Sequence, residues 1–405
     1  MDISNTVEVP RQSFTRLAVV LFFMEWVRGA FLVAYLPAYA LEGGGLSSSI
    51  VGIAVSVHYL TDSLIKGFTG YLLDRFSGRK VLHGGFALSL IGLLLMATTH
   101  DAWILLAASA CLGAGFSPVW IICMSQIREE NRAQQAGILY AYWMAGLGLG
   151  PVTLNLVMGW GLSISLFIIG LFFAAGWIMA AALTLDDTAL VKRPEFTVNQ
   201  QFAALWDKVK KGGFLVPGMV LQTTAGGILA PFLTSFAVKH VGLSHSQLSI
   251  VLLMGGAGVI ALLVPMGKWF DHIGGRWFLV LGFGIFSAAL FGLTSISSFT
   301  GAMGFSLLLG CAYAALLPSW NALMACYIPE DSVGTSWGLL FSIEGLGVVI
   351  GPLIGGWLAS AGNELLPFQV SACMFGLISV VYLLSPSRLF APKERSASKS
   401  MISSS

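Results

Sequence analysis

Charged residues are scarce in this chain. They make up 10% of its 405 residues, while hydrophobic residues make up 56%; soluble domains carry about 25% charged residues. Too few polar residues remain to build a separate soluble domain. The composition therefore predicts a protein embedded in lipid. The net charge of +2 says little about partners, and we expect no nucleic acid among them.

Sequence motifs of common enzyme classes are also missing. The chain has no G-x-x-x-x-G-K-[ST], H-E-x-x-H or paired C-x-x-C motif, and its six histidines are scattered. Its five cysteines fall in apolar stretches at irregular spacing, which favours small buried hydrophobes over disulfides or metal ligands. We therefore expect no enzyme, metal or cofactor. A receptor that binds a ligand without moving it remains an alternative.

Long apolar stretches are abundant. A helix needs about 20 apolar residues to cross the hydrocarbon core of a bilayer, and such stretches recur along the whole chain. The first is too long for a signal peptide and is expected to remain as an anchor. The pattern predicts an all-α membrane protein with twelve spans, at residues 15–41, 48–73, 80–99, 102–124, 133–159, 162–185, 214–240, 246–270, 276–297, 299–327, 333–361 and 365–386.

Lysine and arginine alternate sharply between successive loops. Of the 21 in the chain, all but three lie on the same predicted side as the N-terminus. The exceptions are Lys239 on the opposite side and Arg28 and Lys66 within spans. Positive residues favour the cytoplasmic side. We therefore expect a multi-pass protein of the plasma membrane with both termini in the cytoplasm.

The two halves of the chain repeat each other. Gly, Asp, Gly and Arg recur at the same internal spacing in the loops Gly70–Arg79 and Gly267–Arg276. Two further pairs match on corresponding spans, Ser117–Trp120 with Leu317–Trp320 and Gly150–Pro151 with Gly351–Pro352. The repeats predict a duplicated architecture of two six-helix bundles.

The repeats also predict domain boundaries. We expect an N-terminal bundle at 1–185, a cytoplasmic linker at 186–213, a C-terminal bundle at 214–386 and a basic tail at 387–405. Within the linker, four apolar residues fall at helical spacing with lysines on the other faces: Phe202, Leu205, Trp206 and Val209. This pattern indicates a short amphipathic helix on the membrane surface or a solvated linker helix.

The loop Gly70–Lys80, its partial second copy and Gly146–Pro151 resemble the signatures of the major facilitator superfamily. The resemblance covers the whole chain and implies two bundles that rock about a midplane cavity. It also implies that charged loop residues latch the bundle ends in one state. The matching positions are Asp74, Arg75 and Arg79 in the first copy and Asp271 and Arg276 in the second, where His272 stands in place of the usual arginine.

A narrower resemblance is carried by Phe23–Gly29, His58–Asp62, Ser117–Trp120, the tract around Trp143, Pro318–Asn321 and Trp337–Ile343. Together these motifs look like the proton-coupled glycolipid flippases that supply the lipoteichoic-acid anchor in Gram-positive bacteria. Glu344 and Lys66 depart from that pattern, because both are charged where neutral polar residues are expected.

That resemblance implies a function. It implies an antiporter that moves a glycolipid such as diglucosyl-diacylglycerol from the inner to the outer leaflet, with the proton as coupling ion. It also suggests contact with proteins of lipoteichoic-acid synthesis. The alternative within transport is a drug/proton antiporter that exports amphiphilic compounds. A sugar importer is disfavoured, since the usual sugar-porter signature after span six is missing.

Ionisable side chains within membrane spans are costly and usually functional. Glu25 and Arg28 share one face of span one, and His58, Asp62 and Lys66 form a stripe at every fourth residue of span two. If these faces meet, acids and bases neutralise one another. Glu25 and Asp62 could then hold the coupling proton and accept hydrogen bonds from sugar hydroxyls, with Arg28 and His58 adjusting their proton affinity. A purely structural ion-pair network is the alternative.

Tryptophans complete the predicted substrate cavity. Trp120 and Trp143 lie in the middle of spans rather than at the membrane interface, where tryptophan is usual. An indole face could pack against a sugar ring, although helix packing explains either residue equally well. The C-terminal half contributes fewer strongly polar candidates to the same cavity, namely Gln222, Trp320, Asn321 and Glu344. A polar first half facing an apolar second half suits an amphiphilic molecule.

Overall fold

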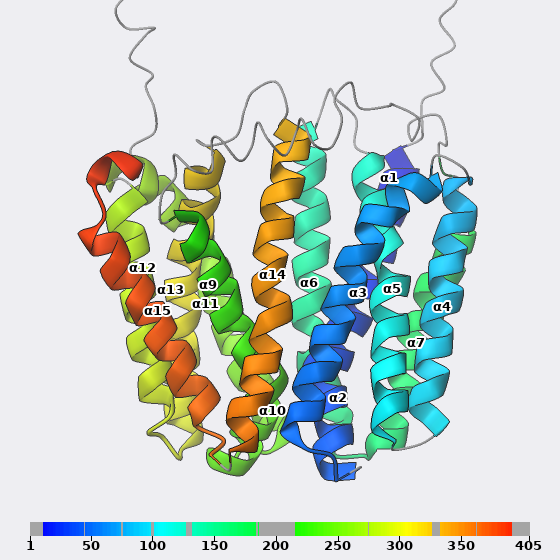
Figure 1. Ribbon diagram of the computed structural model, residues 1–405, viewed down its shortest axis with the longest axis horizontal. Coiled ribbons are helices and arrows are strands. Elements are labelled where there is room, and N and C mark those ends of the chain that lie inside the picture. Colours follow the sequence, from blue (N-terminus) through cyan, green and yellow to red (C-terminus); the bar gives the residue numbers. More distant parts are fainter. Residues whose placement is uncertain are drawn as a thin grey trace, which may run out of the picture. The chain divides into compact units, whose positions relative to one another are not determined.

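The computed structural model describes residues 11–43, 45–73, 76–98, 101–126, 132–183, 185, 215–273, 275–325, 333–361 and 363–390. Every regular element in these ranges is a helix (Figure 1). Twelve of the described segments are long and apolar enough to cross a membrane, which confirms the predicted number. The predicted amphipathic helix of the linker, and the tail from residue 391, lie outside the described residues.

The helices agree with the predicted spans to within a few residues at each end. The first and seventh spans are interrupted. The first consists of α1 (Arg11–Gly29), η1 (Ala30–Tyr35), α2 (Leu36–Ala38) and η2 (Tyr39–Gly43). The seventh consists of α9 (Leu215–Leu229), η5 (Ala230–Phe232), α10 (Leu233–Ser235) and η6 (Phe236–His240). The others are α3 (Ser48–Leu73), α4 (Gly78–Thr98), α5 (Ala102–Ser125), α6 (Arg132–Met158), α7 (Leu162–Ala181), α11 (His245–Ile273), α12 (Gly275–Leu293), α13 (Phe299–Ala325), α14 (Val333–Ser360) and α15 (Leu366–Leu384).

The interruptions occur at corresponding prolines. Pro37 lies in α2 between two π-helical turns, and Pro231 lies in the 3-10 turn before the π-helical η6. Proline removes a backbone donor and clashes with the preceding turn, so the hydrogen-bonding pattern changes around it. The duplication of the chain is therefore visible in its helix irregularities as well as in its loops.

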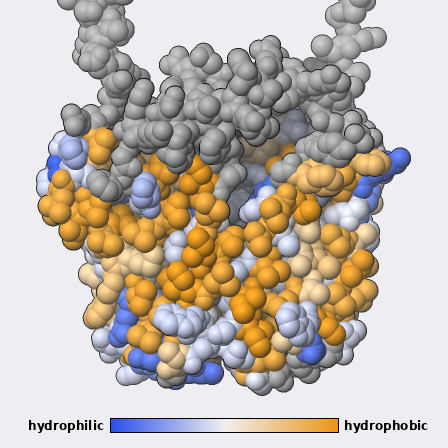
Figure 2. All heavy atoms as spheres, viewed as in Figure 1, coloured by the Kyte–Doolittle hydropathy of each residue, from blue (hydrophilic) through white to orange (hydrophobic). Residues whose placement is uncertain are grey.

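The described helices group into two compact units. The first combines Met1–Pro194 with Gly226–Ile250 and Val348–Pro367, and the second combines Glu195–Ala225, Val251–Gly347 and Phe368–Ser405. This grouping differs from the two halves predicted from the repeats, because the first unit also takes in parts of spans seven, eight and eleven. Apolar residues predominate in the middle of the visible face (Figure 2), as expected for surfaces in contact with lipid.

Small residues set the helix spacing in the first unit. A Cβ atom on Gly29 would overlap the carbonyl oxygen of Leu147, and one on Gly150 that of Trp26. Similarly, a Cβ on Gly113 would overlap the carbonyl oxygen of His58. These positions let α1 approach α6, and α3 approach α5, to backbone contact, as is common between membrane helices. The close approach positions the polar faces of α1 and α3.

Candidate functional site

Glu25 and Arg28 are buried on α1, which packs against α6, α7 and α5. Glu25 is 3% and Arg28 5% exposed. The Cβ of Glu25 lies beside Gly146, where an added Cβ would be only 3.0 Å away. A larger residue at Gly146 would overlap the carbonyl oxygen of Phe22 and push α1, with Glu25, away from α6. The small residues of α6 give α1 the space to place its charged face inside the unit.

The predicted faces of α1 and α3 do meet. An Nη2 atom of Arg28 donates to Oδ1 of Asp62 at 3.1 Å, and Nη1 of Arg28 lies 3.4 Å from Oε1 of Glu25. On the other side, Nζ of Lys66 donates to Oδ2 of Asp62 at 2.5 Å. The guanidinium thus bridges two carboxylates from different spans, and Asp62 bridges two bases. We call these four residues the charged cluster.

The formal charges of the charged cluster cancel, with two acids and two bases. Burying an ion is costly unless it is paired and hydrogen-bonded, so this balance makes the burial tolerable. The pairing is incomplete: among the described residues, Oε2 of Glu25 and Nε of Arg28 are buried with no hydrogen-bond partner. Buried polar atoms are almost always satisfied in proteins. One carboxylate oxygen and one donor therefore remain to interact with a proton or a ligand.

His58 lies one turn from Asp62 and is fully buried. Its ring meets Phe116 edge-on, with centroids 5.9 Å apart, and Tyr59 at 5.5 Å. The guanidinium carbon of Arg28 lies 5.6 Å from the centre of the same Phe116 ring, within the range of a cation–π contact. Phe116 therefore contacts both His58 and the charged cluster, a role that the sequence alone did not indicate.

The two candidate tryptophans of the first unit lie together. The rings of Trp120 on α5 and Trp143 on α6 have centroids 6.3 Å apart, and Tyr140 contacts both, at 5.2 Å and 6.4 Å. Each of the three is half-buried. Sequence reasoning missed Tyr140, although its position three residues before Trp143 places it on the same helical face. The three rings form a partly accessible aromatic cluster.

The candidates of the C-terminal half lie in the second unit. Trp320 is buried, at 5% exposure, and Oε1 of Gln222 is a buried atom without a hydrogen-bond partner in the described residues. The side chain of Asn321 is not among those described. Glu344 is half-buried on α14, and its backbone oxygen accepts a hydrogen bond of 2.9 Å from Thr223. In the first unit, the charged candidates contact one another and so do the two tryptophans. For the second-unit candidates, the described residues show no contact between their side chains.

The loop arginines Arg79 and Arg276 make equivalent contacts in the two repeats. Arg79 donates to the carbonyl oxygen of Ala181 at the end of α7, at 2.8 Å. Arg276 donates to the carbonyl oxygen of Leu383 near the end of α15 and to Oγ of Ser387. Basic side chains commonly satisfy the last carbonyls of a helix. Asp74 and Arg75 lie outside the described residues, as does the side chain of Asp271, so the latch remains a prediction.

Contacts near the ends of the spans tie the two repeats together within the first unit. Oγ of Ser56 on α3 donates to the carbonyl oxygen of Val349 on α14 at 2.7 Å. A Cβ on Gly52 would overlap the carbonyl oxygen of Pro352. Nearer the end of both helices, the hydroxyls of Ser49 and Ser360 lie 2.7 Å apart. Figure 1 shows the lower part of α3 (blue) beside the lower part of α14 (orange), where these contacts lie. We call this set of contacts the seam between α3 and α14.

Comparison with known proteins gives one family. The family model of the Major Facilitator Superfamily matches residues 17–217 and 215–401. The chain is 30% identical to the proton-coupled antiporter flippase LtaA of Staphylococcus saprophyticus over 379 residues, which cover 92% of this chain and 94% of the relative. It is 29% identical to the protein of that name from Staphylococcus epidermidis over 386 residues, covering 94% and 96%.

Solved structures agree on the fold. Two crystal structures of the nucleoside transporter NupG, one of them a variant, superpose with TM-scores of 0.74 and 0.73. They cover 93% and 94% of this chain, and 100% and 99% of their own chains, at 15% and 14% sequence identity. At that identity the similarity establishes the architecture and says nothing about the substrate.

Proposed function

The chain is a membrane transporter of the Major Facilitator Superfamily and not an enzyme, and from that premise we propose that it is a proton-coupled antiporter for a glycolipid. The substrate we propose is a diacylglycerol with a sugar head, such as diglucosyl-diacylglycerol, carried from the inner to the outer leaflet. The names of its relatives, proton-coupled antiporter flippases, support proton coupling and movement between leaflets. The sugar head follows from the motif resemblance described above. The observation that carries the proposal is the charged cluster, in which one buried arginine bridges two carboxylates.

The charged cluster supplies a proton-sensitive element. When both carboxylates are ionised, its charges cancel around Arg28. A proton bound at Oε2 of Glu25, the carboxylate oxygen without a partner, leaves the buried cluster with an excess positive charge. That charge is expensive in a low-dielectric interior. Protonation therefore favours a rearrangement in which Arg28 or Lys66 reaches a new partner, and this rearrangement is the step that couples the proton to transport.

The aromatic cluster supplies a surface for the sugar. The faces of Trp120, Tyr140 and Trp143 are partly accessible, and indole and phenol rings pack well against the C–H surface of a pyranose while their polar edges accept or donate hydrogen bonds. The charged cluster lies in the same unit of the protein as the aromatic cluster, and its carboxylates can accept hydrogen bonds from the hydroxyls of a bound sugar. A sugar head recognised by both groups would link substrate binding to the protonation of Glu25.

The seam between α3 and α14 supplies the conformational element. It is built of small residues and of hydroxyl-to-carbonyl hydrogen bonds, and it contains no ion pair among its described contacts. Such a contact can separate without exposing a buried charge. We propose that it opens and closes as the transporter alternates between its two access states, so that the sugar site faces one leaflet at a time.

A leaflet-resolved flipping assay tests the proposed function. The protein is reconstituted into liposomes with a fluorescent glycolipid, and the fraction in each leaflet is followed with and without an imposed pH gradient. We expect the gradient to accelerate translocation and Glu25→Gln to abolish that acceleration. Glu364→Gln is the matched control, because Glu364 pairs with Lys239 at the surface, where both side chains are more than 40% exposed.

The same preparation distinguishes the alternatives. Translocation that ignores the gradient in the unmodified protein would exclude proton coupling. Export of amphiphilic dyes without glycolipid movement would favour the drug/proton antiporter instead. A third outcome is that Glu25→Gln yields less folded protein, while the folded protein still responds to the pH gradient as the unmodified protein does. That result would identify the charged cluster as purely structural.

A further inference from the structure

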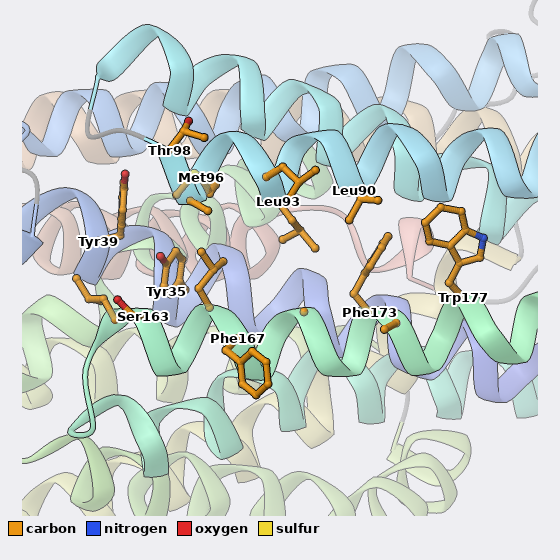
Figure 3. Close-up of a pocket in the computed structure, with 16 residues that line it drawn as sticks. Tyr35, Tyr39, Leu90, Leu93, Met96, Thr98, Ser163, Phe167, Phe173 and Trp177 are labelled. Carbon is orange, nitrogen blue, oxygen red and sulfur yellow. The ribbon is translucent and has the colours of Figure 1, made fainter.

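A second feature of the first unit lies away from the charged and aromatic clusters. A groove of about 730 Å³ runs between α4 and α7 and is bounded at one end by Tyr35 and Tyr39 of the π-helical turns η1 and η2. This volume is within the range of about 300–1,000 Å³ that is typical of small-molecule sites. Figure 3 shows labelled residues of α4 and α7 spaced along the groove, with Tyr39 and Thr98 at one end and Trp177 at the other.

The lining of the groove is amphiphilic along its length. The hydroxyl-bearing residues Tyr35, Tyr39, Thr98 and Ser163 gather at one end. Beyond them the walls are leucine, methionine, alanine and phenylalanine. None of the described lining residues carries a charge. A ligand with a polar but uncharged end and a long apolar tail matches this distribution.

The far end of the groove is rigidly built. The indole N–H of Trp177 donates to Nδ1 of His83 at 2.9 Å, and its ring stacks on Phe86 with centroids 5.7 Å apart. At the polar end, Tyr35 and Tyr39 stack with centroids 5.6 Å apart. Tyr35 ends one π-helical turn and Tyr39 begins the next; such turns are frequent at functional sites.

The length of the groove suits one acyl chain. At 1.5 Å per residue, α7 rises about 22 Å between Leu162 and Trp177. One leaflet of a bilayer core about 30 Å thick is about 15 Å deep. A single chain that enters at the polar end therefore fits beside α7 before it reaches Trp177. The polar end is the one that the distribution of Lys and Arg predicts to face outward.

We propose that this groove binds an acyl chain of an uncharged glycerolipid, with the glycerol and head group against the hydroxyls of Tyr39, Thr98 and Ser163. Because α4 and α7 cross the bilayer, the groove between them is surrounded by lipid. The absence of a basic side chain from the described lining disfavours an anionic phosphate head. This site does not depend on which substrate the transporter moves.

Gly170 provides the test, because it lines the groove and a Cβ added to it meets no other atom within 4 Å. The substitution Gly170→Leu therefore adds side-chain atoms to the groove from a position where its Cβ has open space, and leucine is a better helix former than glycine. The matched control is Gly84→Leu on α4, where a Cβ also meets nothing within 4 Å and which lies outside the groove.

The probe is a sugar-bearing diacylglycerol with a photoreactive diazirine in one acyl chain, added in trace amounts to delipidated protein in detergent. We expect cross-links on peptides of α4 and α7 that fall severalfold in Gly170→Leu and persist in Gly84→Leu. Equal cross-linking in the two variants would overturn the site. Equal cross-linking by phosphatidylglycerol with the same photoreactive chain would overturn the preference for an uncharged head.

Discussion

Replacing Asp62 by asparagine should destabilise the protein far more than replacing Lys66 by methionine, although Lys66 lies closer to Asp62 than Arg28 does. Asp62 accepts from Arg28 at 3.1 Å and from Lys66 at 2.5 Å. The side chain of Arg28 is 7% exposed, whereas that of Lys66 is 33% exposed. Breaking a buried ion pair costs about 3–5 kcal/mol because an uncompensated charge remains. A pair that reaches solvent contributes about 0–1 kcal/mol.

The expected magnitudes follow from this difference in burial. Arg28 keeps Glu25 at 3.4 Å when Asp62 is lost, so we place Asp62→Asn at the low end of the range, about 3 kcal/mol. For Lys66→Met we expect about 1 kcal/mol or less. The double variant Asp62→Asn with Arg28→Met removes both charges of the buried pair. It should therefore be less destabilised than the sum of the two single variants.

The assay is the free energy of unfolding of each purified variant, measured by titration of mixed micelles with sodium dodecyl sulfate. Helicity measured by circular dichroism reports unfolding, and Glu364→Gln serves as the surface control. A smaller destabilisation in Asp62→Asn than in Lys66→Met would refute the reasoning. So would strict additivity in the double variant, because it would mean that Arg28 and Asp62 do not interact.

Three further predictions follow from contacts in the first unit. Cysteines introduced at Ser49 and Ser360 should form a disulfide on oxidation, which should stop translocation until a reductant breaks it. Uninterrupted transport by the cross-linked protein would exclude opening of the seam between α3 and α14. Gly113→Val should lower the thermal unfolding midpoint, because its side chain would overlap the backbone of α3, while Gly84→Val should have little effect; equal midpoints would contradict the packing. Trp143→Ala should weaken glycolipid binding, measured as a raised KM for flipping at pH-gradient saturation, and an unchanged KM would remove the aromatic cluster from the sugar site.

Much of the fold could be predicted from the sequence because membrane spans are encoded locally. A run of about 20 apolar residues is sufficient to define a span, so all twelve appear at their predicted places. The duplication could be read from matched loops such as Gly70–Arg79 and Gly267–Arg276. The pairing of Glu25 with Arg28, and of Asp62 with Lys66, also follows from helical spacing within one span.

Other features required the tertiary structure. That Arg28 reaches Asp62 depends on how α1 and α3 pack around α5 and α6, which involves residues far apart in the chain. The same is true of the contact of Arg79 with the end of α7 and of the groove between α4 and α7. Local sequence determines which side chains share a helical face. Which faces meet is decided by the packing of all helices together, where a single glycine such as Gly113 sets the distance between two backbones.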